Sequence, residues 1–311
     1  MRAAGRRPLV SGYWPGPGAR RLAVGGRAES LPLLLEGGVR IHTRSMHCAL
    51  NLPYGSHPRQ HSDLFVPAGA ERSALVIGLH GGWWQQGRHE DLRLLCLALA
   101  EQGIPAATLD FRPLESARHG EQVIDELTVA VTRILEEGAL CGLDGRSLIL
   151  LGSGSGSLLA LVLASRLTAD PKLRVRAVVA CGVTPSLDHA DGLAPALLKH
   201  VDQFAGSQRH ALSPMHLRPD SFPPLLLLHG DADLDVPART AQKFHQRQIE
   251  AGEASTLAVL SLDSHQFLEQ PYERDGRAAL ERILPFVRDH AEGPVEETAL
   301  VAESGDESQV P

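Results

Sequence analysis

The stretch Ser147-Leu-Ile-Leu-Leu-Gly152-Ser-Gly154-Ser-Gly156-Ser157 carries most of the information on the fold. The four apolar residues before Gly152 predict a strand buried on both faces, as the parallel strands of α/β sheets are. An apolar segment of helical length runs from Ser155 to Leu167, so only small residues are left to form the connection. Glycine adopts the backbone conformations of a sharp turn without steric cost. The stretch therefore predicts a strand, a tight turn and a helix.

The same alternation of apolar strands and amphipathic helices extends in both directions, from about residue 44 to residue 290. It predicts an α/β fold with about eight strands in a mostly parallel sheet and helices on both faces. The expected strands are His47–Leu52, Ser62–Val66, Ala74–Leu79, Ala106–Leu109, Ser147–Leu151, Val175–Ala180, Pro224–Leu228 and Leu257–Leu260. The expected helices are Glu90–Gln102, Gln122–Glu137, Ser155–Leu167, Ala194–Phe204, Pro237–Ala251 and Arg277–Ala291.

Length and composition favour one domain, because 311 residues, 43% of them hydrophobic, can bury a single full core. We expect this domain to span residues 44–290. Within it, residues 185–224 interrupt the alternation and are expected to form a cap over the carboxyl edge of the sheet, or else a long surface loop. The Arg-, Gly- and Pro-rich residues 1–43 predict a flexible arm leading into the domain. The acidic residues 291–311 predict a disordered tail.

Charge and cysteine spacing argue against several classes of function. The net charge is −7 and no basic stripe lies in the predicted domain, so nucleic acid is not an expected partner. The four cysteines are far apart and have no partner at metal-ligand spacing, which predicts reduced, mostly buried thiols: Cys48, Cys96, Cys141 and Cys181. No apolar run is long enough to span a membrane. We expect a cytoplasmic protein without a metal or other cofactor.

The segment His80-Gly81-Gly82-Trp83-Trp84 directly follows a predicted strand. Two consecutive glycines let the backbone turn closely beneath a bound ligand. The amides of Gly82 and Trp83 can then point at a developing oxyanion. The alternative is a glycine-rich turn that connects strand and helix and has no chemical role.

Two further patterns follow the last predicted strands. Leu228-His-Gly-Asp-Ala-Asp-Leu-Asp-Val-Pro237 contains three acids, and one of them is expected to cap the helix that begins at Pro237. Asp235 is the best placed for that role. Ser264-His265-Gln-Phe267 lies between the final strand and the final helix.

Together these patterns resemble the α/β-hydrolase fold family, and within it the esterase, lipase and kynurenine-formamidase branch, which carries a His-Gly-Gly-x-Trp loop. The resemblance covers roughly residues 45–290. It implies that His265 is the general base and that Asp233 orients its imidazole ring. Ser264 departs mildly from the glycine that the family has before this histidine. The oxyanion and binding loop implied by the resemblance comprises Gly81, Gly82, Trp83 and Trp84.

One position departs strongly from the family pattern, which is Gly-x-Ser-x-Gly with the serine as nucleophile. When Gly152 and Gly156 are aligned with the family's two glycines, Gly154 stands at the nucleophile position and has no side chain to attack with. In a register shifted by one residue, Ser155 is the nucleophile instead. In the family register, Ser155 gives its backbone amide to the oxyanion and its side chain points away from the pocket.

The resemblance thus implies an α/β-hydrolase of esterase or lipase type, with carboxylic-ester or arylformamide hydrolase ancestry. The histidine, the acid and the oxyanion loop are retained, and Gly154 replaces the nucleophile, so we expect an inactive or weakly active pseudoenzyme. The alternative is an active serine esterase that uses Ser155. A pocket walled by Trp83, Trp84 and residues 185–224 predicts a small, partly apolar ester-like or amide-like ligand.

Overall fold

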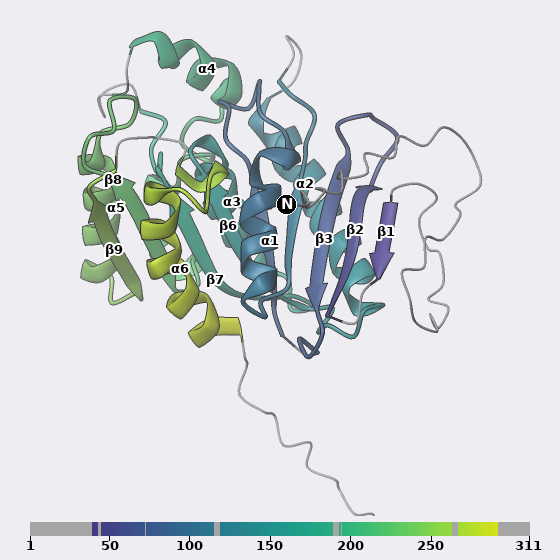
Figure 1. Ribbon diagram of the computed structural model, residues 1–311. Helices are drawn as coiled ribbons and strands as arrows, with labels where there is room; N and C mark the ends of the chain where they lie inside the picture. The colour runs from purple at the N-terminus through teal and green to yellow at the C-terminus, as the bar shows by residue number, and fades with distance from the viewer. Residues whose placement is uncertain are drawn as a thin grey trace, which may run out of the picture.

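A computed structural model describes residues 39–42, 45–71, 73–114, 119–188, 193, 195–262 and 267–291. In these ranges nine strands form one sheet, in the order β1-β2-β3-β5-β4-β6-β7-β8-β9 (Figure 1). The strands are β1 (Val39–His42), β2 (Met46–Pro53), β3 (His61–Pro67), β4 (Leu75–Leu79), β5 (Ala106–Leu109), β6 (Ser147–Ser153), β7 (Arg174–Cys181), β8 (Leu225–Gly230) and β9 (Ser255–Leu260). The helices are α1 (Arg93–Glu101), α2 (Gly120–Ala139), α3 (Ser155–Leu167), α4 (Pro195–Ala205), α5 (Ala238–Glu250) and α6 (Arg274–Ala291), with short 3-10 helices at His89–Leu92, Pro214–His216, Pro219–Ser221 and Phe267–Glu269.

The sheet is antiparallel at one end and parallel through the rest. The pairs β1/β2, β2/β3 and β3/β5 are antiparallel, and all neighbours from β5 to β9 run parallel. Helices α1 and α6 cover one face, and α2, α3 and α5 cover the other (Figure 1). This is the mostly parallel, two-sided arrangement that the alternating pattern predicts.

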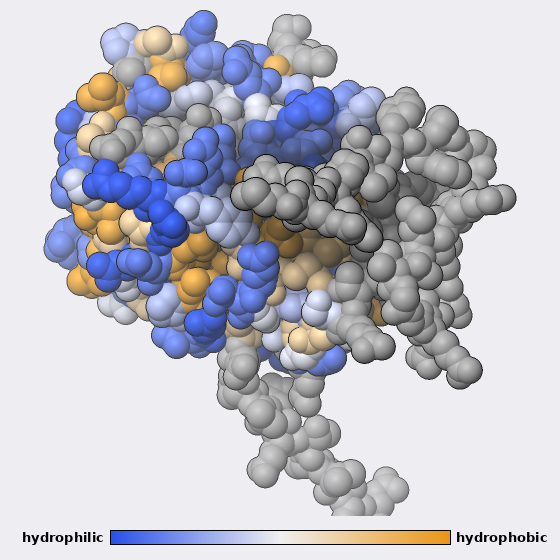
Figure 2. All heavy atoms as spheres, in the orientation of Figure 1, coloured by the Kyte–Doolittle hydropathy of each residue, from blue (hydrophilic) through white to orange (hydrophobic). Residues whose placement is uncertain are grey.

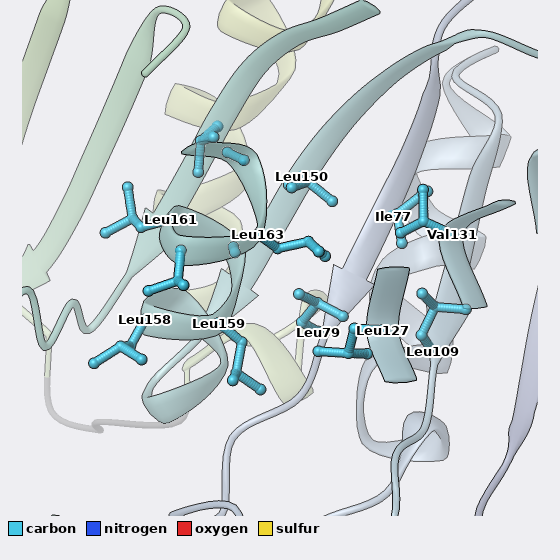
Figure 3. Packing of buried hydrophobic residues seen from close by; sticks show 14 of the residues in the cluster. Ile77, Leu79, Leu109, Leu127, Val131, Leu150, Leu158, Leu159, Leu161 and Leu163 are labelled. Atoms are coloured by element: carbon cyan, nitrogen blue, oxygen red, sulfur yellow. The ribbon is translucent and has the colours of Figure 1, made fainter. Parts of the chain in front are cut away.

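The parallel strands are apolar throughout because their side chains alternate between two hydrophobic clusters. In β6, Leu148 and Leu150 belong to the cluster that includes α2 and α3, whereas Ile149 and Leu151 belong to the cluster with α1 and α6. Figure 3 shows the first cluster, in which α3 supplies four closely spaced leucines. A strand buried on both sides fixes where its two ends lie, and this positions the turn that follows β6.

Strand β1 is the main difference from the prediction, because it lies inside the segment expected to be an arm. Its four residues pair with β2 from Val39↔Leu50 to His42↔His47. Four residues are too few to show a convincing period in the sequence, so the strand is recognisable only from its pairing partner. The rest of the predicted arm and the tail from residue 292 onward lie outside the described residues.

Among the described residues, the surface shows no helix suited to a membrane span. On the face shown in Figure 2, apolar residues around β9 and α6 are interspersed with hydrophilic ones. No helix within the described ranges has the length and apolar character needed to cross a membrane.

Cys96 and Cys181 are buried and Cys48 and Cys141 are partly exposed, so the prediction of buried thiols holds for two of the four. The expected cytoplasmic location stays a prediction.

Candidate functional site

The three predicted motifs lie at the carboxyl ends of parallel strands. His80 follows β4, Gly154 follows β6, and Asp231 follows β8. Because β4 and β6 are neighbours and only β7 separates β6 from β8, all three motifs reach the same edge of the sheet. His265 lies in residues 263–266, outside the described residues, so its predicted role as base stays a prediction.

The turn between β6 and α3 is centred on Gly154. Its backbone has φ 53° and ψ −121°, a region that costs a residue with a side chain on the order of 1–3 kcal/mol. The Gly154 amide donates to the carbonyl of Cys181 on the neighbouring strand at 2.8 Å. Residue 154 is therefore the point of the connection at which a residue with a side chain would be strained.

The two flanking glycines let α3 begin directly against the sheet. A Cβ on Gly156 would lie 2.2 Å from the carbonyl oxygen of Leu79, and one on Gly152 would lie 2.3 Å from the Cα of Ser157. Neither position has room for a side chain. The two close-packed glycines thus lie two residues on either side of Gly154.

Ser155 is the first residue of α3 and is 3% exposed. Its hydroxyl oxygen accepts a hydrogen bond from the backbone N–H of Trp83 at 2.8 Å. Its carbonyl oxygen accepts one from the indole Nε1–H of Trp84 at 3.1 Å. The Ser155 side chain thus points at the Gly-Gly-Trp-Trp loop, because α3 packs directly against the end of β4. The family register predicts that this side chain points away from the pocket, so the observed orientation differs from the expected one.

The loop that meets Ser155 has an unusual backbone. Trp83 has φ 51° and Trp84 has φ 61°, both in the left-handed region that residues other than glycine rarely adopt. Gly82 has φ 97°, and a Cβ there would lie 2.4 Å from the carbonyl oxygen of Gln86. Strain of this kind persists only where the surroundings hold it, and it gathers at functional sites.

Trp84 is held by the segment predicted as a cap. Its ring stacks on Phe204 of α4 with a 4.0 Å centroid separation, and both side chains are fully buried. Gln85 adds a hydrogen bond to Gln203 at 2.6 Å. Trp84 therefore anchors α4 on the loop and offers no surface to a ligand in this structure, whereas Trp83 is only partly buried.

A buried ion network lies behind the loop and is centred on Asp110. Arg59 donates to both carboxylate oxygens, at 2.8 and 2.7 Å, and His80 lies 3.1 Å from one of them through Nε2. Arg59 also donates to the carbonyl of Gly87. Burial opposes the charge of Asp110, but hydrogen bonds from His80, His89 and Arg59 outweigh it and hold the pKa of this carboxyl far below its usual range.

His89 joins Asp110 to a second buried carboxylate, Asp63. Its Nδ1 lies 3.4 Å from Asp110 and its Nε2 lies 3.5 Å from Asp63, which in turn accepts from Arg93 Nε at 2.6 Å. Burial alone would lower the pKa of His89, but the carboxylates of Asp110, Asp63 and Glu90 together raise it to about 9. His89 is therefore a buried cation at neutral pH.

Within the described residues, His89, Glu90 and Asp110 bring three potential metal ligands within 4.8 Å of one another. The guanidinium of Arg59 already binds both oxygens of Asp110, and both ring nitrogens of His89 face acceptors. These cations occupy the positions in which an ion would bind, so the group suits ion pairing rather than metal binding.

Of the three acids after β8, only Asp233 has a buried side chain, which is 2% exposed. One of its carboxylate oxygens accepts from the backbone N–H groups of Asp235 and Val236, at 2.9 and 3.0 Å. The other lies 3.4 Å from Nε2 of His229. Asp231 and Asp235 are exposed, and no side chain caps α5. The prediction that Asp235 caps this helix is wrong. The N–H groups of Asp235 and Val236, which precede α5, donate to Asp233 instead.

The ion network of Arg59, Asp63, His89 and Asp110 is not predicted from the sequence. Its members come from segments that are far apart in the chain, so their spacing shows no motif. The one available signal is Asp63, which stands in the strand predicted from Ser62 to Val66 and is fully buried there. A charge in a buried strand requires a partner.

Comparisons with known proteins find several similar sequences. The BD-FAE family model matches residues 62–178. The probable isoprenylcysteine alpha-carbonyl methylesterase ICME of Oryza sativa subsp. japonica is 24% identical over 276 residues, covering 80% of this chain and 66% of that protein. Isoprenylcysteine alpha-carbonyl methylesterase ICME of Arabidopsis thaliana is 23% identical over 249 residues, covering 71% and 57%. The chain thus spans less than two thirds of the length of these relatives.

Solved structures give the same fold. Esterase B from Lactobacillus rhamnosis matches with a TM-score of 0.67 and 18% identity, covering 80% of this chain and 87% of that one. A thermostable esterase from Pseudomonas putida ECU1011 matches with a TM-score of 0.63 and 17% identity, covering 83% of each chain. The chain therefore has the α/β-hydrolase fold, and the proteins that it is similar to include esterases.

Proposed function

We propose that this protein binds a small, partly apolar ester-like or amide-like ligand in an esterase-type site whose nucleophile position, Gly154, is vacant. In this proposal Gly82 and Trp83 supply the oxyanion amides, His265 is the base, and Asp233 orients it. Without a serine hydroxyl at residue 154, hydrolysis is slow or absent. The methylester named for the plant relatives and the arylformamide of the kynurenine-formamidase resemblance are both within this ligand class.

The observation that carries the proposal is the backbone of Gly154. It has φ 53° at the junction of strand and helix, between two glycines that have no room for a side chain. A nucleophile in this fold sits at such a strained strand-to-helix turn. The alternative nucleophile, Ser155, lies one residue into α3, and its hydroxyl is engaged by the Trp83 amide. This contact weighs against an active esterase that uses Ser155.

The test measures p-nitrophenyl butyrate hydrolysis by the unmodified protein and by Gly154→Ser, Ser155→Ala and His265→Ala. We expect no turnover above background from the unmodified protein and a gain of at least about 10²-fold in Gly154→Ser, since a missing serine nucleophile costs far more than that. Adding His265→Ala to Gly154→Ser should remove the gain. Turnover by the unmodified protein that Ser155→Ala abolishes would establish the alternative instead.

Binding is tested separately, because a vacant site is expected to hold an ester that it does not cleave. Saturation-transfer NMR with methyl butyrate should detect binding to the unmodified protein. Trp83→Ala should weaken the signal, while Val129→Ala, at an exposed position on α2, should leave it unchanged. Equal signals from all three proteins would contradict the assignment of the pocket to this loop.

A further inference from the structure

The Trp83 amide has an acceptor inside the protein. The nitrogen lies 2.8 Å from Oγ of Ser155, within the range of about 2.7–3.1 Å at which an oxyanion-hole donor meets a substrate oxygen. A backbone amide carries one hydrogen, so it makes one full hydrogen bond to one acceptor at a time. The Ser155 hydroxyl therefore stands where a substrate oxyanion would have to bind.

The contact belongs to a buried, hydrogen-bonded part of the site. Ser155 is buried, and its carbonyl oxygen also accepts from the ring of Trp84, so this one residue bonds to both tryptophans. The hydroxyl of Ser157, one residue beyond Gly156, turns the other way and donates to the carbonyl of Gly154 at 2.6 Å. Position 155 is thus the point at which the turn and the loop are joined.

We propose that Ser155 acts as a built-in occupant of the oxyanion site, so that this chain is blocked at two positions, by the missing hydroxyl at Gly154 and by the filled Trp83 amide. The inference rests on the proposed function. The same inference limits which ligands the unmodified site can bind. A planar, uncharged ester or amide is accepted. A tetrahedral anion is disfavoured, because it needs the Trp83 amide, which already donates to Ser155. Restoring the nucleophile alone then restores only part of the site.

The first test does not depend on catalysis. Hydrogen exchange of the Trp83 amide is measured by NMR in the unmodified protein and in Ser155→Ala, Ser155→Thr and Ser157→Ala. Loss of the acceptor should speed Trp83 exchange at least about tenfold in Ser155→Ala. Ser155→Thr keeps a hydroxyl and Ser157→Ala removes one that does not reach the loop, so both should keep the slow rate. Unchanged exchange in a folded Ser155→Ala protein would overturn the inference.

The second test compares Gly154→Ser with Gly154→Ser/Ser155→Ala, using a p-nitrophenyl alkylphosphonate. The introduced hydroxyl bonds to phosphorus, p-nitrophenolate leaves, and the hydroxyl proton passes to the proposed base, His265. Because one oxyanion donor is worth about 10²–10³-fold in rate, the double variant should label at least about tenfold faster. Equal or slower labelling would overturn the inference. Labelling of neither variant would contradict the proposed function instead, and the Trp83 exchange would still decide the role of Ser155.

Discussion

The proposed oxyanion loop and the turn that faces it are held in place by different means. The loop is braced from behind by buried side chains that bond to Asp110, including Arg59 and His80. The turn has no such support and is shaped by backbone atoms packed against Gly152 and Gly156. The geometry of neither region depends on a side chain at residue 154. The proposed vacant nucleophile position is therefore compatible with an otherwise preserved site. The two means of support should fail under different substitutions.

Asp110→Asn should have the largest effect on the loop. The substitution leaves Arg59 and His89 as buried cations without the carboxylate that they share. Removing one partner of a buried ion pair lowers the free energy of unfolding by about 3–5 kcal/mol. Urea unfolding measures the loss. Asp220→Asn serves as the control, since its pair with Arg218 is exposed and its removal should leave the midpoint unchanged. A loss in Asp110→Asn no larger than in this control would show that the network does not brace the loop.

The charge of His89 makes the same network sensitive to pH. Its pKa is raised from 6.5 to about 9 in the folded protein, so its contribution is fully present below pH 6.5 and is lost as the pH rises through 9. At 1.36 kcal/mol per unit, the loss is on the order of 3 kcal/mol. Unfolding free energies measured from pH 6 to 9.5 should fall accordingly.

The matched variant for this pH dependence is His89→Gln. Burial raises the pKa of the Cys48, Cys96 and Cys181 thiols, so they too reduce stability at alkaline pH. The difference between the unmodified protein and His89→Gln removes that shared contribution. If both proteins lost stability in parallel between pH 6.5 and 9, His89 would not be the titrating group.

The turn should instead be destabilised by a side chain added at one of its close-packed glycines. Gly156→Ala places a methyl group 2.2 Å from the Leu79 carbonyl, and backbone on both sides prevents relaxation, so we expect a cost of about 3 kcal/mol. The variant should also push α3 away from β4 and weaken the hydrogen bond between Trp83 and Ser155. Thermal unfolding and Trp83 amide exchange measure the two effects. An unchanged Trp83 amide would show that the loop keeps its position without the turn.

The same contrast explains what the sequence could predict. The bounds of α3 and the end of β6 follow from an apolar pattern that local residues impose, and the structure matches them closely. Asp63 and Asp110 meet His89 only because β3 and β5 are neighbours in the sheet, and no local period encodes that pairing. The direction of the Ser155 side chain likewise depends on how α3 docks against β4.

Gly154→Ala should give the smallest effect and tests the turn most directly. The methyl group adds no function, so any loss of stability reports the backbone conformation at φ 53°, which we expect to cost about 1–2 kcal/mol. Gly230→Ala is the matched control, because its Cβ would meet Leu262 at an ordinary 3.5 Å and should be neutral or slightly stabilising. A Gly154→Ala protein as stable as the Gly230→Ala control would mean that residue 154 is not strained. The turn would then offer no sign that a nucleophile once occupied it, and Ser155 would become the better candidate.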